Sequence, residues 1–145
     1  MLYADNRQAR YHYEILETFE GGLMLTGPET KAIREGGAKL AGAYIRLLGG
    51  VLTLVGAHIS RYSKNGKPED QLPSRPRTIL VHAKEQRYLA TKTQVRGLTI
   101  IPLSFYPKAR RIKLAFALCR GKQLHDKREA LKKRDQTRDA GRELS

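Results

Sequence analysis

The chain has 145 residues, which suits one domain, and a domain of this size buries roughly two-thirds of the surface that its unfolded chain exposes. It carries 28 Lys and Arg against 14 Asp and Glu, so its formal net charge is +14. Six of the basic and six of the acidic residues precede position 61, so the whole excess lies in the last 85 residues. This asymmetry is typical of a protein that binds a polyanion, although a basic surface without a partner is the simpler alternative.

Composition also excludes several classes of protein. No run approaches the roughly 18 apolar residues of a membrane-spanning helix, and the start of the chain lacks the apolar stretch of a secretory signal. The single cysteine, Cys119, cannot form an internal disulfide, which agrees with a reducing compartment. We therefore expect a cytoplasmic protein that does not enter a membrane.

The first predicted structure in the chain is a β-hairpin. Residues 11–19 are rich in aromatic and β-branched side chains, which favour a strand. Gly21 and Gly22 follow, and this pair is predicted to turn the chain into a second short strand at 23–25.

A helix and a second hairpin are predicted next. Thr26 is a candidate N-cap for a helix at 28–35, because its hydroxyl can accept a hydrogen bond from a free amide at the helix start. Residues 43–48 and 51–57 are apolar runs, and the Gly-Gly pair between them supplies the positive φ angles of a tight turn. Residues 60–77 contain three prolines and mixed charge without periodicity, so they are predicted to form an exposed and mobile loop.

The second half of the chain is predicted to hold a short strand, a helix and a third hairpin. Residues 78–81 form the apolar strand, and 84–96 form the helix, which a glycine ends. The hairpin comprises 98–105 and 111–119, joined by the sequence YPKAR.

The last strand shows the alternation of a half-buried strand. Ile112, Leu114 and Phe116 are predicted to face inward, whereas Lys113 faces outward. Pro102 has no amide hydrogen, so it favours an edge or bulge position. Three hairpins interrupted by two or three short helices predict a mainly β fold: a small antiparallel OB-like β-barrel rather than a parallel α/β sheet.

The sequence changes character after Arg120. Seven basic residues lie from Arg120 to Arg134, both ends included, and the large apolar residues of the segment are three leucines. Because these are too few to bury a helix face, we expect a tail that is disordered in the free protein and helical when bound. The predicted organisation is an OB-like barrel at 1–120 and a basic C-terminal tail at 121–145.

The sequence offers little support for catalysis. Its four histidines, His12, His58, His82 and His125, include no pair at a metal-binding helical spacing, and a zinc site would need a second cysteine. There is no glycine-rich phosphate loop that ends in GK[ST]. We predict no catalytic residue, no metal and no cofactor, although carboxylates that the fold brings together would not be visible in a sequence.

Basic and aromatic residues are interleaved in three segments. The sets are Arg7, Arg10, Tyr11 and Tyr13; Arg61, Tyr62 and Lys64; and Tyr106, Lys108, Arg110 and Arg111. Cationic groups neutralise phosphates and aromatic faces stack unpaired bases, so the pattern favours an RNA-binding surface. For each tyrosine alone, a role in the core or on a solvated surface is the simpler interpretation.

Several ordered segments resemble the SmpB family. They are NRQARYHYEILETFEGG at 6–22, GPETKAIREG at 27–36, RPRTILVH at 75–82, GLTIIPLSFY at 97–106 and RGKQLHDKR at 120–128. The resemblance extends from Asn6 to Arg134, and several motifs in order are more specific than any one of them. It departs from the family pattern at Pro28, in the proline-rich loop, and after Arg134, where the basic charge falls off.

The resemblance implies an OB-like barrel that binds the tRNA-like domain of transfer-messenger RNA, and a tail that the ribosome reads. Such a protein delivers the RNA to the A site of stalled ribosomes, with its tail in the small-subunit decoding region and the message channel. The nascent chain is then tagged by trans-translation. We expect a monomer. The alternative is another OB-type RNA-binding protein of the ribosome or its assembly, which would give the tail no special role.

By the family pattern, Asn6, Glu20, Leu80 and Lys113 match the RNA-contacting surface. Glu20 would accept hydrogen bonds from base edges or orient basic neighbours, and its alternative role is to cap a turn. On composition alone Leu80 is a core residue, and Lys113 could be a solvated lysine rather than a phosphate contact. With the basic segments, the predicted RNA-binding set is Asn6, Arg7, Arg10, Glu20, Arg61, Leu80, Lys108, Arg110 and Lys113.

In the tail, Gly121 and the HDKR sequence that follows match the family's ribosome-facing motif. Gly121 is expected to release the chain from the last strand, and His125 to stack on a nucleobase, unless it is an ordinary surface histidine. The predicted ribosome-facing set is Gly121, Lys122, His125, Asp126, Lys127, Arg128, Lys132, Lys133 and Arg134.

Overall fold

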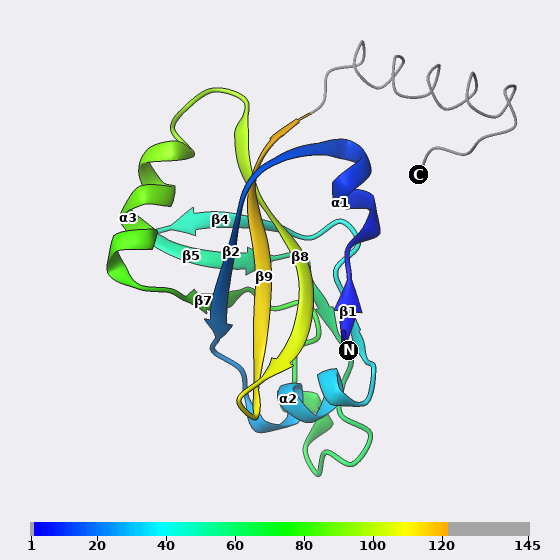
Figure 1. Ribbon diagram of the computed structural model, residues 1–145. Helices are drawn as coiled ribbons and strands as arrows, with labels where there is room; N and C mark the ends of the chain where they lie inside the picture. The colour runs from blue at the N-terminus through cyan, green and yellow to red at the C-terminus, as the bar shows by residue number, and fades with distance from the viewer. Residues whose placement is uncertain (1, 122–145) are drawn as a thin grey trace, which may run out of the picture.

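The computed structural model describes residues 2–121 (Figure 1), and the tail residues from 122 onward lie outside this range. Within it, the elements in chain order are β1 (Ala4–Asp5), α1 (Arg7–His12), β2 (Tyr13–Leu23), α2 (Gly27–Arg34), β3 (Ala38–Lys39), β4 (Tyr44–Leu48), β5 (Val51–Val55), β6 (His58–Ile59), a 3₁₀ turn (Pro68–Asp70), β7 (Arg77–Leu80), α3 (Ala83–Lys92), β8 (Leu98–Lys108) and β9 (Arg111–Gly121). None of the helices in this part of the chain is long and apolar enough to cross a membrane.

Six strands close into a ring. The order of strands in the sheet is β1-β8-β4-β5-β7-β2-β9. Because β9 also pairs with β8, the strands from β8 to β9 in this order form a closed ring, and β1 lies outside it. All of these pairings are antiparallel. Figure 1 shows the long strands β2, β9 and β8 running together while β4 and β5 cross them at a steep angle. This architecture confirms the predicted mainly β, OB-like fold with short helices.

Local sequence signals explain several of these elements. The Thr26 hydroxyl accepts a hydrogen bond from the Glu29 amide at 3.2 Å, and the Glu29 carboxylate accepts one from the Thr26 amide at 2.9 Å, which completes a capping box. Gly49 and Gly50 turn β4 into β5 with φ angles of 59° and 80°. Pro102 begins the register shift of β8 against β9. The predicted helix start, second hairpin and proline bulge are therefore confirmed.

The interior of the ring is the main core. Ile112, Leu114 and Phe116 are buried there, as the alternation predicts. Because successive strand residues face opposite sides, Ile100 packs inside the ring, whereas Ile101 packs in a second, smaller cluster against α1. The two clusters cover both faces of the β8–β9 hairpin.

The prediction of a turn at Gly21 and Gly22 is wrong. Residues 13–23 form one continuous strand, which changes partner from β9 to β7 at these glycines. A Cβ atom on Gly21 would lie 2.8 Å from Cγ2 of Ile79 and 3.1 Å from the carbonyl oxygen of Leu80. The glycine therefore permits a close approach of β7 rather than a reversal of the chain.

The helix predicted at 84–96 is also too long. Helix α3 ends at Lys92, and Thr93 is its C-cap, whose hydroxyl donates to the carbonyl oxygens of Leu89 and Ala90, at 3.0 and 3.2 Å, in the last turn. Leu89 is fully buried, whereas Val95 beyond the helix is 53% exposed. The apolar residues that suggested a longer helix do not share one face.

Helix α1 was not predicted, since residues 11–13 were assigned to a strand. Asn6 holds the helix in place through two hydrogen bonds. Its side-chain amide donates to the carbonyl oxygen of Pro102 at 2.9 Å, and its backbone amide donates to the carbonyl oxygen of Leu103 at 2.8 Å. Ala9 then packs onto the hairpin with 3% exposure. These contacts join residues about a hundred positions apart, so no local pattern could show them.

The loop at 60–77 is more organised than its composition indicates. Gln71 is 5% exposed, accepts a hydrogen bond from the Tyr62 amide at 2.9 Å and donates one to the carbonyl oxygen of Ser60 at 2.8 Å. Arg77, predicted as the end of this loop, is fully buried and opens β7. The prediction of an exposed segment therefore fails for these two side chains.

Candidate nucleic-acid interface

A buried ionic cluster fixes α2 against β7. Glu29 is 1% exposed and Arg77 is 0% exposed, and the Glu29 carboxylate accepts hydrogen bonds from Arg77 at 2.9 Å and from Arg75 at 2.5 Å. Burial opposes the charge of Glu29, but the hydrogen bonds from Arg75, from the Thr26 amide and from Arg77 hold the pKa of its carboxyl below the usual value. Arg77 also donates to the carbonyl oxygens of Ala57 and Pro73. These bonds compensate the buried charges, so α2 and β7 form one unit.

A shallow hollow of about 290 Å³ lies where β2 leaves β9 for β7, and we call it the β2 hollow. Glu20, Leu80 and Lys113 line it together, although 93 residues separate the first from the last. Leu80 is 52% exposed, so it is not a core residue. The fold thus joins three of the predicted RNA-contacting residues in one depression of the surface.

Glu20 organises the polar side of this hollow. Its carboxylate accepts hydrogen bonds from the Tyr106 hydroxyl and from the Lys108 ammonium, the latter at 2.9 Å. The bond from Tyr106, followed by that from Lys108, holds the pKa of the Glu20 carboxyl below its usual value. Burial, together with the Glu20 carboxylate, raises the pKa of the Tyr106 hydroxyl. Glu20 lies within a continuous strand, so it does not cap a turn but presents an ionised acceptor that orients its neighbours.

The other predicted RNA-binding residues lie elsewhere on the barrel. Asn6 is 5% exposed and holds α1, while Arg7 and Arg10 at the same end lie 3.9 and 3.8 Å from Asp5. Arg61 lies in the loop, where its Nε donates to the carbonyl oxygen of Gln71. The fold therefore divides the predicted set among separate regions of the surface, and the region around Glu20 is the one where Glu20, Leu80 and Lys113 line the same hollow.

Gly121 is the last described residue of the predicted tail motif. It ends β9 and pairs with Tyr13 at the start of β2. The predicted ribosome-facing residues from Lys122 to Arg134 lie outside the described residues.

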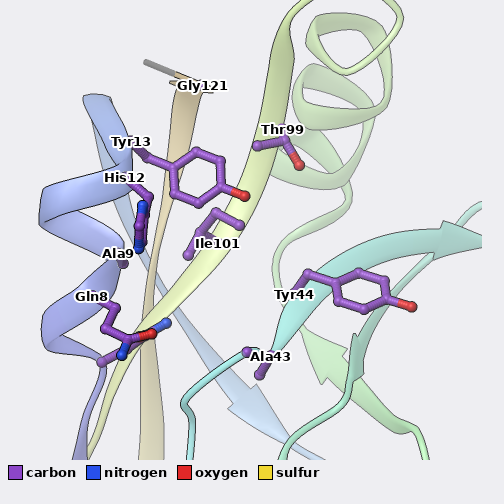
Figure 2. Close-up of a pocket in the computed structure, with 11 residues that line it drawn as sticks. Gln8, Ala9, His12, Tyr13, Ala43, Tyr44, Thr99, Ile101 and Gly121 are labelled. Carbon is purple, nitrogen blue, oxygen red and sulfur yellow. The ribbon is translucent and has the colours of Figure 1, made fainter. Parts of the chain in front are cut away.

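A larger hollow, of about 620 Å³, lies beside α1. Figure 2 shows the ring of Tyr13 above Ile101, with His12 projecting from α1 on the same side and Tyr44 on the opposite side. Gly121 also lines this hollow, so β9 ends at its edge. The sequence pattern pointed to Tyr13 but missed Tyr44 and His12, because only the pairing of β4 with β8 brings them near each other.

The chemistry of these surfaces defines a class of protein. No group of three or more potential metal ligands of the His, Cys, Asp and Glu type occurs among residues 2–121. The hollow beside α1 offers the aromatic rings of Tyr13 and Tyr44, and the β2 hollow offers the cation of Lys113 and the acceptor Glu20. Such groups bind unstacked bases and phosphates. The fold and these hollows are those of a small basic OB-type protein of the nucleic-acid-binding class.

Comparisons with known proteins identify the family. The family model for SmpB protein matches residues 3–145. The SsrA-binding protein of Trichormus variabilis is 49% identical over 140 residues, which cover 97% of this chain and 90% of that protein. The SsrA-binding protein of a Roseiflexus species is 42% identical over 141 residues, which cover 97% of this chain and 89% of that protein. A solved structure described as "tmRNA-SmpB: a journey to the center of the bacterial ribosome" contains a chain with a TM-score of 0.69 and 38% identity, with 97% of each chain covered. This chain belongs to the SmpB family.

Proposed function

We propose that this protein binds the tRNA-like domain of transfer-messenger RNA and delivers it to stalled ribosomes for trans-translation. Membership of the SmpB family supports the proposal, as do relatives named SsrA-binding protein and the similarity to a chain from a tmRNA-SmpB ribosome structure. One observation assigns the proposed RNA contact to particular residues: Glu20, Leu80 and Lys113 line the same β2 hollow.

Three side chains of the β2 hollow have distinct roles in this proposal. The exposed Leu80 offers an apolar surface on which a base or ribose can pack, away from water. Glu20 stays ionised and accepts hydrogen bonds from base edges, with Tyr106 and Lys108 holding it in place. Lys113 contacts a phosphate, which fixes the position of the RNA but reads no sequence.

The hollow beside α1 is a second RNA-facing surface in this proposal. Tyr13 and Tyr44 offer ring faces to an unstacked base, and the polar atoms of His12 and Gln8 can bond to its edge. Because Gly121 lines the same hollow, this surface adjoins the point from which the tail continues.

The tail carries the ribosome-facing role. We place it in the decoding region and message channel of the A site, with the motif that begins at Gly121 and includes His125 as its main contact; the HDKR sequence supports this assignment. The protein catalyses no step itself, uses no metal or cofactor, and acts as a monomer in the cytoplasm. Peptidyl transfer belongs to the ribosome, and the tag-encoding frame to the RNA.

The first test is to sequence the RNA that copurifies with the full-length protein. We expect transfer-messenger RNA to be enriched over other RNAs of similar abundance. Enrichment of ribosomal RNA alone would favour the alternative of an OB-type ribosomal or assembly protein. No enrichment of any RNA would refute an RNA-binding function.

A matched pair of variants tests the β2 hollow. Leu80→Ala should weaken binding to the tRNA-like domain several-fold, because it removes apolar surface that the RNA covers. Leu72→Ala is the control, since Leu72 is 59% exposed, compared with 52% for Leu80, but lies outside the hollow. Equal affinities of the two variants in filter binding would show that Leu80 does not contact the RNA.

A further inference from the structure

A third hollow, of about 200 Å³, lies where the turn between β8 and β9 meets α2. Figure 1 shows this turn beside α2 at one end of the molecule. Four basic residues line the hollow: Arg34 from α2, and Arg110, Arg111 and Lys113 from the hairpin. No acidic residue is among the side chains that line it.

In the part of the chain that the structure describes, no carboxylate pairs with the arginines of this hollow, Arg34, Arg110 and Arg111. In contrast, Lys108 on the adjacent strand is paired with Glu20 at 2.9 Å. Like charges held together by the fold repel one another, and a bound anion would relieve that repulsion.

The backbone of the turn is shaped to present these groups. Ala109 and Arg110 have φ angles of 50° and 65°, as a two-residue hairpin turn requires, yet neither is the glycine, asparagine or aspartate that this turn favours. The Nη2 of Arg34 donates to the carbonyl oxygen of Arg110 at 3.0 Å, which ties its guanidinium to the turn. An arginine in a conformation that costs free energy is a reason to look for a function at that position.

Lys113 connects this hollow to the β2 hollow, because it lines both. A polynucleotide that packs on Leu80 and passes over Lys113 is therefore led toward the arginines. The floor is aliphatic, with Leu23, Leu25 and Ile112, which suits the apolar edge of a ribose. The two hollows therefore adjoin at Lys113.

We propose that Arg34, Arg110, Arg111 and Lys113, the turn cradle, bind a backbone phosphate of the RNA that occupies the β2 hollow. This inference rests on the proposed function. A guanidinium matches the geometry of phosphate oxygens through paired N–H donors, and Arg34 is already oriented by the turn. The contact sets the position of the RNA on the barrel without reading its bases, so Arg34 and Arg111 are positioning residues.

The test compares salt dependence in the full-length protein. Arg34→Gln and Arg111→Gln should each lower the slope of log affinity against log salt measurably, by at most about 0.7 to 0.9, which is the value for loss of one whole phosphate contact. Affinity for the tRNA-like domain should fall about tenfold, as expected for one hydrogen bond to a charged group. Arg46→Gln is the control, since Arg46 is exposed on β4 outside the cradle and forms no ion pair within residues 2–121.

Arg110→Gly separates function from folding. Glycine adopts a positive φ without steric cost, so the melting temperature should stay the same or rise while the salt slope falls. A purely structural arginine would instead lower the melting temperature and leave the slope unchanged. That result would overturn the inference.

Ethylation of single RNA phosphates locates the contact. In the wild type, one ethylated phosphate should weaken binding, and in Arg111→Gln the same ethylation should have no further effect. Inorganic phosphate at constant ionic strength should not compete, whereas saturable competition would reassign the cradle to free phosphate.

If the wild type binds the RNA but the cradle variants keep its slope of log affinity against log salt, the cradle is refuted and the proposed function stands. If the wild type does not prefer this RNA over other RNAs, the proposed function fails first.

Discussion

Replacing Glu29 by glutamine should destabilise the protein strongly. Glutamine keeps the size of the side chain but removes the charge opposite Arg77, which is 0% exposed. Breaking a buried ion pair on one side costs about 3 to 5 kcal/mol. We expect the lower end, about 3 kcal/mol, because Arg77 keeps its bonds to the carbonyl oxygens of Ala57 and Pro73, and Arg75 can turn toward water. For a domain of this size the melting temperature should fall by roughly 10 °C.

Urea and thermal unfolding at neutral pH measure this loss, with Glu35→Gln as the control at the exposed end of the same helix. The control should change the free energy of unfolding by less than about 0.5 kcal/mol. Because the folded state holds the pKa of Glu29 below its usual value of 4.5, the stability that it contributes is complete above that pH and is lost as the pH falls through the lowered pKa. The difference in the free energy of unfolding between the wild type and Glu29→Gln should therefore become smaller in acid. Equal stability of the two variants, or a gap independent of pH, would refute this account of the cluster.

Three further predictions concern the strand crossing, the RNA and the tail. Gly21→Ala should lower the free energy of unfolding by about 1 to 3 kcal/mol through overpacking, since its Cβ would lie 2.8 Å from Ile79, whereas Gly22→Ala, with its nearest contact at 3.5 Å, should be tolerated better. Chemical denaturation compares the two. Lys113→Glu should reduce the salt slope of RNA binding by about one contact and leave the melting temperature unchanged; a collapse in stability would make Lys113 structural. A chain that ends at Gly121 should keep its melting temperature and bind transfer-messenger RNA within a few-fold of the full chain, yet fail to tag nascent chains on stalled ribosomes. Tagging at the full rate would contradict the role given to the tail.

Short-range signals determined much of the architecture. The Gly49-Gly50 turn and the capping box of Thr26 and Glu29 depend on residues within three positions of each other, so the chain specifies them before it folds. The alternation at Ile112 and Leu114 identified a strand with one face in the core. Composition and the SmpB motifs then indicated the class of fold and the class of partner.

Only the tertiary structure decided where the side chains proposed to contact RNA meet. Glu20, Leu80 and Lys113 lie on β2, β7 and β9, and the ring closure that joins these strands is a sum of long-range pairings with no local trace. For the same reason the sequence could not show that Arg34 reaches the turn at Arg110, 76 residues away. A glycine pair can reverse a chain or admit a neighbouring strand, and packing against β7 selected the second outcome at Gly21 and Gly22, because that arrangement buries Ile79 in the core.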